Sequence, residues 1–265
     1  LHAVDYVFSW LGHYDILLAI VKLIEDAMNM EYDVNHVGVP VIILVEDSVR
    51  FYSSYLPNIY KIIFLQSKKF MSEGLNEHQK TMRMRGRPKI LLATNYEQVT
   101  EYYERYKDNV LGVISDMNYE REGVKDPHAG LRLCKKIREE DRFMPFLLQS
   151  SDAKNITHAK RLHVDFIDKN SKTLNKRLRN YIINNYSFGD FLFYDPKECT
   201  VVGRASDLQE LQNLIREVPD DVLRFHINRN HFSKWLKSRA LYHIADMFKF
   251  MRAEHFNDLT EVRNF

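Results

Sequence analysis

Residues 39–47 read VPVIILVED, an unbroken run of aliphatic and β-branched residues that ends in two acids. Such a run is typical of a parallel strand that is covered on both faces. Four further runs follow it: KILLAT at 89–94, VLGVISD at 110–116, PFLLQSS at 145–151 and VDFIDK at 164–169. Segments with helical spacing of apolar residues separate the runs, at 95–107, 130–140, 156–162 and 173–185. This alternation predicts an α/β fold, a doubly wound five-stranded parallel sheet with right-handed crossovers.

Polar residues stand at the carboxyl ends of these predicted strands, the edge at which doubly wound sheets bind ligands. They are Glu46 and Asp47 after the first strand, Asp116 after the third, Ser150 at the fourth and Lys169 after the fifth. Three converging carboxylates repel one another unless a cation lies between them. A hard, octahedral ion such as Mg²⁺ suits their oxygen atoms.

Asp116 is then the expected nucleophile, because a carboxylate can attack phosphorus in line and give an acyl phosphate. Lys169 is expected to pair with a phosphoryl oxygen, and the Ser150 hydroxyl to donate a hydrogen bond to another. Movement of Ser150 would open space into which Phe166 could rotate. The charge added at Asp116 would thereby change the shape of the protein surface near Phe166. Simpler interpretations are that Glu46 and Asp47 cap the following helix and that Phe166 is a core aromatic residue.

Residues 39–187 resemble the CheY-like receiver domain of bacterial response regulators. The resemblance is carried by four motifs that follow one another in the receiver order: ILVED, ISD, LLQSS and FIDK. The resemblance implies a cytoplasmic phosphoprotein of two-component signal transduction or a phosphorelay, phosphorylated on Asp116 by a histidine kinase or a small phosphodonor. It implies a Mg²⁺ cofactor, with the backbone carbonyl of Asn118 as a further ligand. Such a module regulates an attached or partner domain and is not itself an enzyme.

A different class of function stays open beside the receiver. The chain could be a pseudo-receiver, a protein-interaction or dimerisation scaffold that keeps the fold without being phosphorylated. A homodimer is compatible with either function. Metal-dependent phosphorylation would discriminate between the two.

Three features depart from the receiver pattern. Asn170 stands where receivers carry proline, and residues 118–129 (NYEREGVKDPHA) lengthen the loop after Asp116. The first crossover, 48–88, is also long, and we expect a helix over 48–72, a break at Gly74 and a basic helix over 76–86. Four segments resemble the N-terminal regulatory region of phosphoenolpyruvate synthase-like proteins: VEDSVRFYSSYLP, EGLNEHQKTMRMRGRPKILLATNYE, LLQSSD and NRNHFSKWLKSRA. That narrower resemblance implies catalytic domains outside this chain.

The flanking segments suggest additional parts. Residues 4–10 (VDYVFSW) predict a strand, 14–29 a helix and 30–38 a linker. A weak similarity between residues 1–7 and 162–167 indicates that 1–31 is the strand-helix fragment of a preceding receiver-like domain. A chain that starts at Leu1 without Met is consistent with an excised piece. Residues 188–265 are expected to form a small, mainly helical region, irregular or β-like over 188–205 and helical over 206–217 and about 229–252.

The composition is that of a globular chain, with 45% hydrophobic and 28% charged residues. A net charge of +2 gives no argument for nucleic acid or an acidic membrane, and the apolar runs are too short to span a bilayer. Two cysteines cannot form a disulfide framework and fit a reducing compartment. We interpret residues 80–89 (KTMRMRGRPK) as the solvated face of a helix, both tryptophans as core anchors, and His231 as structural.

Overall fold

The computed structural model describes residues 5–72, 86–249, 251–256 and 258–264. The chain separates into two compact units, Leu1–Tyr181 and Ile182–Phe265. Each unit has its own cluster of buried apolar side chains. The residues that the sequence assigns to chemistry all lie in the first unit.

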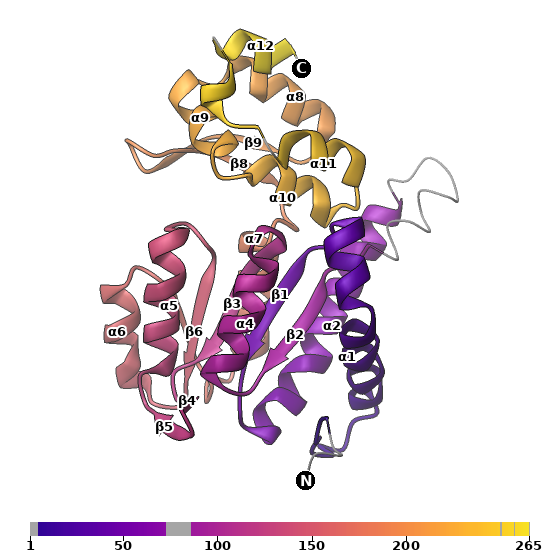
Figure 1. Ribbon diagram of the computed structural model, residues 1–265, viewed down its shortest axis with the longest axis vertical. Helices are drawn as coiled ribbons and strands as arrows, with labels where there is room; N and C mark the ends of the chain where they lie inside the picture. Colours follow the sequence, from indigo (N-terminus) through magenta and orange to yellow (C-terminus); the bar gives the residue numbers. More distant parts are fainter. Residues whose placement is uncertain (1–4, 73–85, 250, 257, 265) are drawn as a thin grey trace. The chain divides into compact units, whose positions relative to one another are not determined.

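A five-stranded parallel sheet forms the centre of the first unit (Figure 1). Its order is β2-β1-β3-β6-β7, which is the flavodoxin-like 2-1-3-4-5 order of a doubly wound sheet. The predicted fold class is therefore confirmed. The strands are β1 (Val41–Val45), β2 (Lys89–Ala93), β3 (Val110–Asp116), β6 (Phe146–Ser150) and β7 (Asp165–Asp168).

Helices cover both faces of this sheet, so most residues of its strands are apolar and buried (Figure 1). Ile43 of β1 shares one core cluster with Val99 and Leu133, which places two of the helices on its face. On the opposite face, Asn58 Nδ2 donates to Asn175 Oδ1 (3.1 Å). This bond joins the helix that follows the first strand to the helix that follows the last strand. The five helices are α2 (Val49–Ser72), α4 (Tyr96–Tyr106), α5 (Ala129–Glu140), α6 (Ile156–Arg161) and α7 (Leu174–Asn185).

The prediction for the long first crossover is confirmed in its first half, since α2 spans most of residues 48–72. The break at Gly74 and the second helix over 76–86 fall almost entirely outside the described residues. The short 3₁₀ turns Lys107–Asn109 and Ala153–Asn155 precede β3 and α6.

The strand expected over residues 4–10 does not form in the described part, residues 5–10. That segment lies against α2 instead. Ser9 N donates to Ser53 Oγ (3.0 Å), the Tyr52 hydroxyl donates to the Val7 carbonyl, and the Phe8 ring meets Tyr52 edge to face. Side chains of α2 thus bond backbone groups that a neighbouring strand would otherwise satisfy.

Residues 30–38 are helical rather than a linker. Helix α1 (Asp15–Tyr32) runs three residues beyond its expected end, and a π-helical turn (Asp33–Val37) follows it. Burial explains the difference, because Met30 and Val34 belong to the core of the first unit. Gly38 then ends the segment in the left-handed region (φ 83°), which glycine adopts without strain. The origin of residues 1–31 in a preceding domain stays a prediction.

A buried charge cluster attaches α1 to the edge strand β2. The carboxylate of Asp26 is fully buried and accepts hydrogen bonds from Arg87 (2.7 Å), the Tyr60 hydroxyl (2.9 Å) and the backbone N of Ile90 (3.0 Å). Arg87 and Lys89 are themselves buried. The interpretation of residues 80–89 as a solvated helix face is therefore wrong for these two residues, and 80–85 lie outside the described part of the chain.

The lengthened loop after Asp116 forms a two-stranded antiparallel hairpin, β4 (Tyr119–Arg121) and β5 (Val124–Asp126). Its turn contains Glu122 and Gly123, both with positive φ. The Tyr119 side chain is fully buried in the core of the first unit. A single bridge between Asn95 and Glu120 also joins the hairpin to the start of α4. The loop is thus an anchored structural element.

The second unit combines a hairpin with short helices. The hairpin is β8 (Phe191–Asp195) and β9 (Thr200–Ala205), so of the two alternatives for 188–205, irregular or β-like, the second is the one observed. The single helix expected over about 229–252 is two helices, separated at Ala240 where φ is 55°. The helices are α8 (Leu208–Glu217), α9 (Asp220–Ile227), α10 (His231–Ser238), α11 (Tyr242–Lys249) and α12 (Leu259–Asn264).

The two tryptophans differ in environment. Trp235 is 2% exposed, and its indole N donates to the carbonyl of Gly189 (3.0 Å), so it anchors the core of the second unit as predicted. Trp10 is 65% exposed, so that prediction is wrong. His231 contacts His226 through their Nδ1 atoms at 2.9 Å, which supports a structural role for it.

Candidate functional site

Three carboxylates meet at the carboxyl end of the sheet. Glu46 and Asp47 directly follow β1, and Asp116 is the last residue of β3. Since β1 and β3 are hydrogen-bonded neighbours, their ends lie side by side at the point where the strand order reverses. One ligand oxygen of each carboxylate lies within 4.8 Å of the others.

Lys169 bridges two of these carboxylates. Its Nζ lies 2.5 Å from Oε2 of Glu46 and 2.8 Å from Oδ2 of Asp116. Lys169 follows β7, which is separated from β3 by one strand, so its side chain reaches across the end of β6. Its ammonium group also lies 4.4 Å from the centre of the Phe51 ring. Lys169 and Glu46 are buried, so this ion pair is removed from water.

Burial changes the acidity of Glu46. Loss of hydration, the largest effect, and the nearby Asp116 carboxylate raise the pKa of Glu46 to about 7, while Lys169 acts in the opposite direction. Glu46 Oε1 also accepts a hydrogen bond from Ser48 N (3.2 Å) just before α2. Glu46 therefore bonds the backbone just before α2 as well as taking part in the carboxylate cluster, and its role as a helix cap stays a prediction.

Asp116 is the most accessible of the bridged groups, with a side chain that is 13% exposed. Its Oδ1 accepts a hydrogen bond from Met117 N (2.7 Å). Gly130, in the first turn of α5, donates from its N to the Met117 carbonyl (3.1 Å), and a Cβ at this position would lie 2.2 Å from the Asp116 carbonyl oxygen. Only glycine permits this close approach, so Gly130 positions the backbone of Asp116.

The hairpin contributes a second cation that sequence reasoning did not assign. Lys125 of β5 forms an ion pair with Asp47. Asp126, the next residue, is held by Arg132 of α5 (2.9 Å). The only signal in the sequence was the lengthened loop itself, which places a lysine within reach of the site.

Two aromatic residues of α2 also line the site, and sequence reasoning missed both. Phe51 contacts Lys169, and the ring of Tyr55 stacks on Phe51 at 6.0 Å. The hydroxyl of Tyr55 is buried and has no hydrogen-bond partner among the described residues. Burial, and then the charges of Glu46 and Asp116, raise the pKa of Tyr55. One helical turn separates the two residues, a spacing that by itself resembles ordinary core packing.

The remaining predicted residues lie at the same edge of the sheet or next to it. Ser150 is buried and its Oγ accepts hydrogen bonds from Asp152 N (3.1 Å) and Asn155 Nδ2 (2.9 Å), which leaves its own proton unused by either bond. Phe166 is buried in the core, 8% exposed. Asn118, whose carbonyl is the expected further ligand, is exposed. The bond between Lys169 and Asn170 is trans, as are all described peptide bonds.

The donor set fits a hard divalent cation. The residues Glu46, Asp47 and Asp116 offer carboxylate oxygens only, the ligand type that Mg²⁺ and Mn²⁺ prefer. The clustering is also costly unless it is neutralised, since Glu46 is held in a buried position beside another carboxylate.

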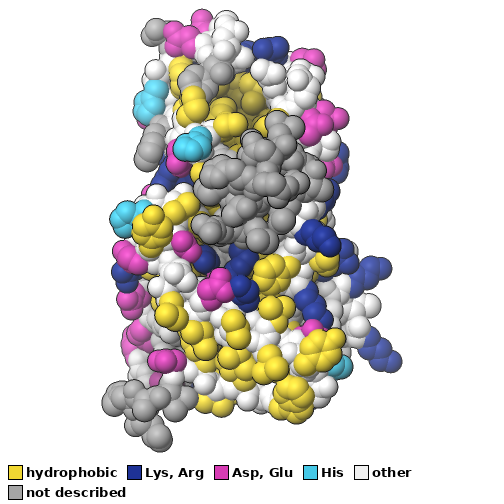
Figure 2. Space-filling view, turned by 90° about the vertical axis from the view of Figure 1, so that its right-hand side faces the viewer, with side chains coloured by type: hydrophobic (Ala, Val, Ile, Leu, Met, Phe, Trp, Pro, Cys, Tyr) yellow, Lys and Arg dark blue, Asp and Glu magenta, His cyan; other side chains and the backbone are white. Residues whose placement is uncertain are grey.

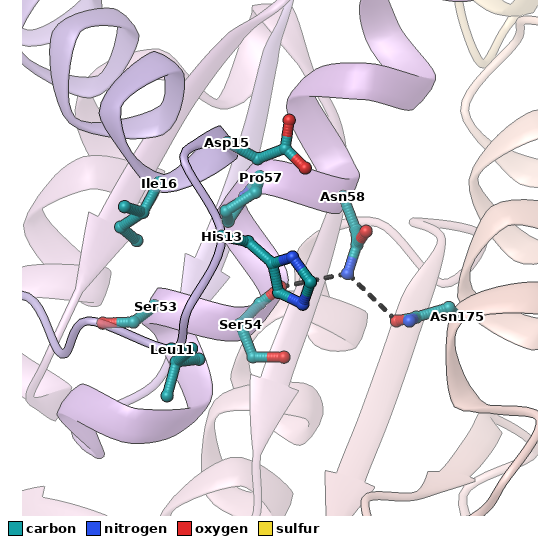
Figure 3. Close-up of a pocket in the computed structure, with 9 residues that line it drawn as sticks. All are labelled: Leu11, His13, Asp15, Ile16, Ser53, Ser54, Pro57, Asn58 and Asn175. Carbon is teal, nitrogen blue, oxygen red and sulfur yellow. Dashed lines mark hydrogen bonds between the residues drawn. The ribbon is translucent and has the colours of Figure 1, made fainter.

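A pocket of about 320 Å³ lies elsewhere in the first unit, between the segment that precedes α1 and the middle of α2 (Figure 3). Pro57 and Asn58 line one side of it, and Leu11 and His13 another. Asn58 Nδ2 donates to the Ser54 carbonyl as well as to Asn175. None of the three clustered carboxylates lines this pocket, so we place the candidate site at the sheet edge.

Comparisons with known proteins add a similarity of fold. No protein-family profile and no curated protein matches the chain. A response regulator receiver domain protein from Clostridium thermocellum is 15% identical, with a TM-score of 0.36, and the match covers 55% of this chain and 93% of that one. The non-phosphorylated HemR receiver domain from Leptospira biflexa is 19% identical (TM-score 0.32; 53% and 90% covered). The Mn²⁺-bound response regulator Rcp1 is 13% identical (TM-score 0.32; 54% and 92% covered).

At these identities and TM-scores the similarities carry no argument about function. The order of the strands identifies the fold. The clustered carboxylates and Lys169 identify the candidate site. The narrower resemblance to phosphoenolpyruvate synthase-like proteins gains no support from any match. Among the described helices, none is both long and apolar enough to cross a membrane.

Proposed function

We propose that the first unit is a phospho-accepting receiver module in which Asp116 takes the phosphoryl group. One observation carries the proposal: carboxylates from the ends of β1 and β3 lie within 4.8 Å of one another, and Lys169 from the end of β7 contacts both Glu46 and Asp116. The proposed nucleophile, the proposed metal ligands and a lysine ammonium group thus come together from the ends of three strands. In-line transfer of a phosphoryl group to a carboxylate is favoured by such a nucleophile with positive charge beside the phosphoryl oxygens.

Mg²⁺ is the proposed cofactor, held by Glu46, Asp47, Asp116 and the backbone carbonyl of Asn118. When bound, it supplies positive charge to the equatorial oxygens of the transferring phosphoryl group. The acceptor carboxylate then stands beside a cation, which favours its charged, nucleophilic form.

In the transfer step, a carboxylate oxygen of Asp116 attacks phosphorus in line. A bond forms between that oxygen and phosphorus, and the bond from phosphorus to the leaving group of the donor breaks. The donor is the phosphohistidine of a kinase or a small acyl phosphate. Met117 N keeps its hydrogen bond to Oδ1 and so orients the carboxylate.

Two further residues respond to the new negative charge. Lys169 moves its hydrogen bond from Oδ2 of Asp116 to a phosphoryl oxygen, while it stays paired with Glu46. The Ser150 hydroxyl proton, which neither of its accepted bonds uses, is donated to a second phosphoryl oxygen. Displacement of Ser150 would free space for a rotation of Phe166, the proposed switch residue.

The wider assignments stay proposals. The receiver would comprise residues 39–187, act in the cytoplasm with a histidine kinase or small phosphodonor, and regulate an attached or partner domain. The controlled enzyme would be phosphoenolpyruvate synthase-like if the narrower sequence resemblance holds. Residues 188–265 would form a separate region whose role is open.

A specific observation favours a second candidate, a pseudo-receiver that serves as a scaffold. Lys169 and Lys125 together contact all three clustered carboxylates, so much of the negative charge is already balanced by side chains. A site neutralised in this way could persist as a structural ion-pair network without metal or phosphate.

Intact-mass spectrometry after incubation with acetyl phosphate and Mg²⁺ separates the two candidates. We expect one added phosphoryl group on the parent chain, and none with EDTA or in Asp116→Asn. Asp126→Asn is the matched control, because it removes a nearby carboxylate outside the cluster, and it should be modified like the parent. Absence of an adduct on the parent chain, together with no Mg²⁺ binding by calorimetry, would favour the scaffold.

A further inference from the structure

Helix α1 presents a continuous row of large apolar side chains to solvent. The row begins with the residue just before the helix, and we call it the α1 stripe. Its members are Tyr14 (80% exposed), Leu17 (58%), Val21 (60%), Ile24 (44%) and Met28 (80%). Tyr32, the last residue of α1, is 65% exposed and extends the stripe by one further helical turn. Figure 2 views the side of the molecule on which α1 lies in Figure 1, and hydrophobic side chains gather across the lower half of that view.

The stripe is not needed to hold α1 in place. The opposite face of the helix is buried through Ile16, Ala19 and Leu23, and Asp26 carries the buried bonds to Arg87 and β2. Both faces of the helix are therefore apolar, whereas a helix with a single buried face has a polar outer side.

The exposed area is large for a monomer. With side chains of about 150–250 Å² for the aromatic members and somewhat less for the others, the stripe and Tyr32 expose roughly 700 Å². The largest apolar patch of a typical monomer is about 300–600 Å². A stable two-chain interface takes about 600–1,000 Å² from each partner, and the area of the stripe lies within that range.

The spacing of the stripe is that of a helix that pairs with another helix. The intervals from Tyr14 to Leu17, Val21, Ile24 and Met28 are three, four, three and four residues, as in two-helix packing at a shallow crossing angle. An antiparallel second copy of the stripe would set Leu17 against Met28 and Val21 against Ile24. The stripe is therefore complementary to itself under a two-fold axis.

The charged residues that border the stripe are paired with each other within the chain. Lys22 and Glu25, which border the stripe, pair with each other at 2.5 Å, and the stripe itself carries no charged side chain. Pairing two stripes therefore buries no unpaired charge from the stripe itself.

We propose that the α1 stripe binds the same stripe of a second copy of this chain, so that the protein is a two-fold symmetric dimer through antiparallel α1 helices. This surface lies outside the carboxylate cluster, and the proposal does not depend on phosphorylation. It identifies the dimerisation face on a helix that precedes the first strand of the sheet.

Sedimentation equilibrium of the full chain, over about 1 to 100 µM, tests the proposal in the range where interfaces of this size associate. We expect a dimer for the parent chain. Val21→Lys and Met28→Lys each place a charge in the interface twice, once per copy, and should weaken the dimer by roughly 100-fold. Circular dichroism establishes that each variant is folded.

Met247→Lys is the matched control, since Met247 is also a methionine on a helix and is 54% exposed. It should dimerise like the parent. A monomeric parent chain at every concentration would overturn the proposal, and so would a dimer that Val21→Lys and Met28→Lys leave unchanged or that Met247→Lys weakens equally.

Cysteine cross-linking tests the orientation. In a Cys199→Ser background, which removes the exposed free cysteine, we expect a mixture of Val21→Cys and Ile24→Cys chains to form a disulfide-linked heterodimer under mild oxidation. Val21→Cys alone should cross-link much less. Efficient cross-linking of Val21→Cys to itself, with none in the mixture beyond it, would overturn the antiparallel arrangement.

Discussion

Lys169 and Glu46 form a buried ion pair, with Nζ 2.5 Å from Oε2, although 123 positions separate them in the chain. The pair joins the ends of β1 and β7, the second and the last strands across the sheet. The same ammonium group contacts Asp116 at 2.8 Å. Lys169 therefore has a structural role in the resting site and the proposed catalytic role on phosphorylation.

Replacement Lys169→Met should destabilise the first unit in a pH-dependent way. Without the ammonium group, burial raises the pKa of Glu46 further above the ordinary value of 4.5. The folded variant then takes up a proton that the unfolded chain releases, so it loses stability as the pH rises above 4.5. We expect a loss of about 3 kcal/mol at pH 8 and a smaller loss at pH 5.5. Urea unfolding at both pH values measures it.

Lys107→Met is the control for that experiment, because Lys107 pairs with Glu104 and Glu140 on the surface. It should cost less than about 1 kcal/mol at either pH. An equal loss of stability for Lys169→Met at pH 5.5 and pH 8 would contradict the role assigned to Glu46.

Replacement Lys125→Met should tighten divalent metal binding. Lys125 holds Asp47, one of the proposed ligands, and its removal frees that carboxylate. The Lys125 side chain is 60% exposed, so solvent screens the pair and the gain should be modest, roughly 3-fold in Kd, and smaller at high salt. Electron paramagnetic resonance of free Mn²⁺ measures the affinity. Lys136→Met, which removes an equal charge from α5, should leave Kd unchanged, and weaker binding by Lys125→Met would refute the competition between lysine and metal.

Replacement Gly130→Ala should disturb the backbone beneath Asp116. The added methyl group would lie 2.2 Å from the Asp116 carbonyl oxygen, so α5 or the end of β3 must move. We expect a loss of at least about 2 kcal/mol in urea unfolding. Gly123→Ala provides the comparison, since open space surrounds that position and only its φ of 77° is strained, which costs about 1 kcal/mol. A smaller loss for Gly130→Ala than for Gly123→Ala would be inconsistent with the close contact.

The parallel sheet could be predicted because its strands are buried on both faces and so read as continuous apolar runs. The residues Glu46, Asp116 and Lys169 could be placed together for the same reason, since parallel strands end at one edge. Sequence patterns could not foresee the hairpin, because β4 and β5 are polar and short and their stability depends on the burial of Tyr119.

Other features depend on long-range contacts that no local pattern encodes. The apolar run at residues 4–10 has the composition of a strand, but its backbone bonds to side chains of α2, such as that of Ser53. Arg87 and Lys89 lie in a basic stretch that resembles a solvated surface, yet they are buried beside Asp26, which lies 61 positions before Arg87. Trp10 looked like a core residue and is exposed, since aromatic content alone does not determine burial.

Acid should destabilise the second unit through its histidine pair. Burial, and then the positive charge of Arg229, lower the pKa of His226 from 6.5 to about 3, and burial also lowers the pKa of His231. The unfolded chain therefore binds protons that the folded unit excludes. Stability from His226 is present above pH 6.5 and is lost as the pH falls toward 3, at roughly 1.4 kcal/mol per pH unit.

His226→Gln tests this dependence. The amide oxygen can still accept the hydrogen bond that Tyr194 N donates to His226 Nε2 (2.9 Å), but the side chain no longer titrates. Urea unfolding between pH 7 and pH 4, followed by Trp235 fluorescence in a Trp10→Phe background, should show a flatter pH dependence than in the parent chain. Equal slopes in the two chains would exclude His226 as the titrating group.

The central claim is that Asp116 itself carries the phosphoryl group, and the most direct measurement locates the modification. Treatment with acetyl phosphate and Mg²⁺, followed by borohydride reduction and peptide mapping, converts an acyl phosphate on aspartate to homoserine at that position. We predict homoserine at position 116, with neither Asp47 nor Asp126 altered. A reduced residue at another position, or full retention of aspartate at 116 in a chain that binds Mg²⁺, would contradict the claim.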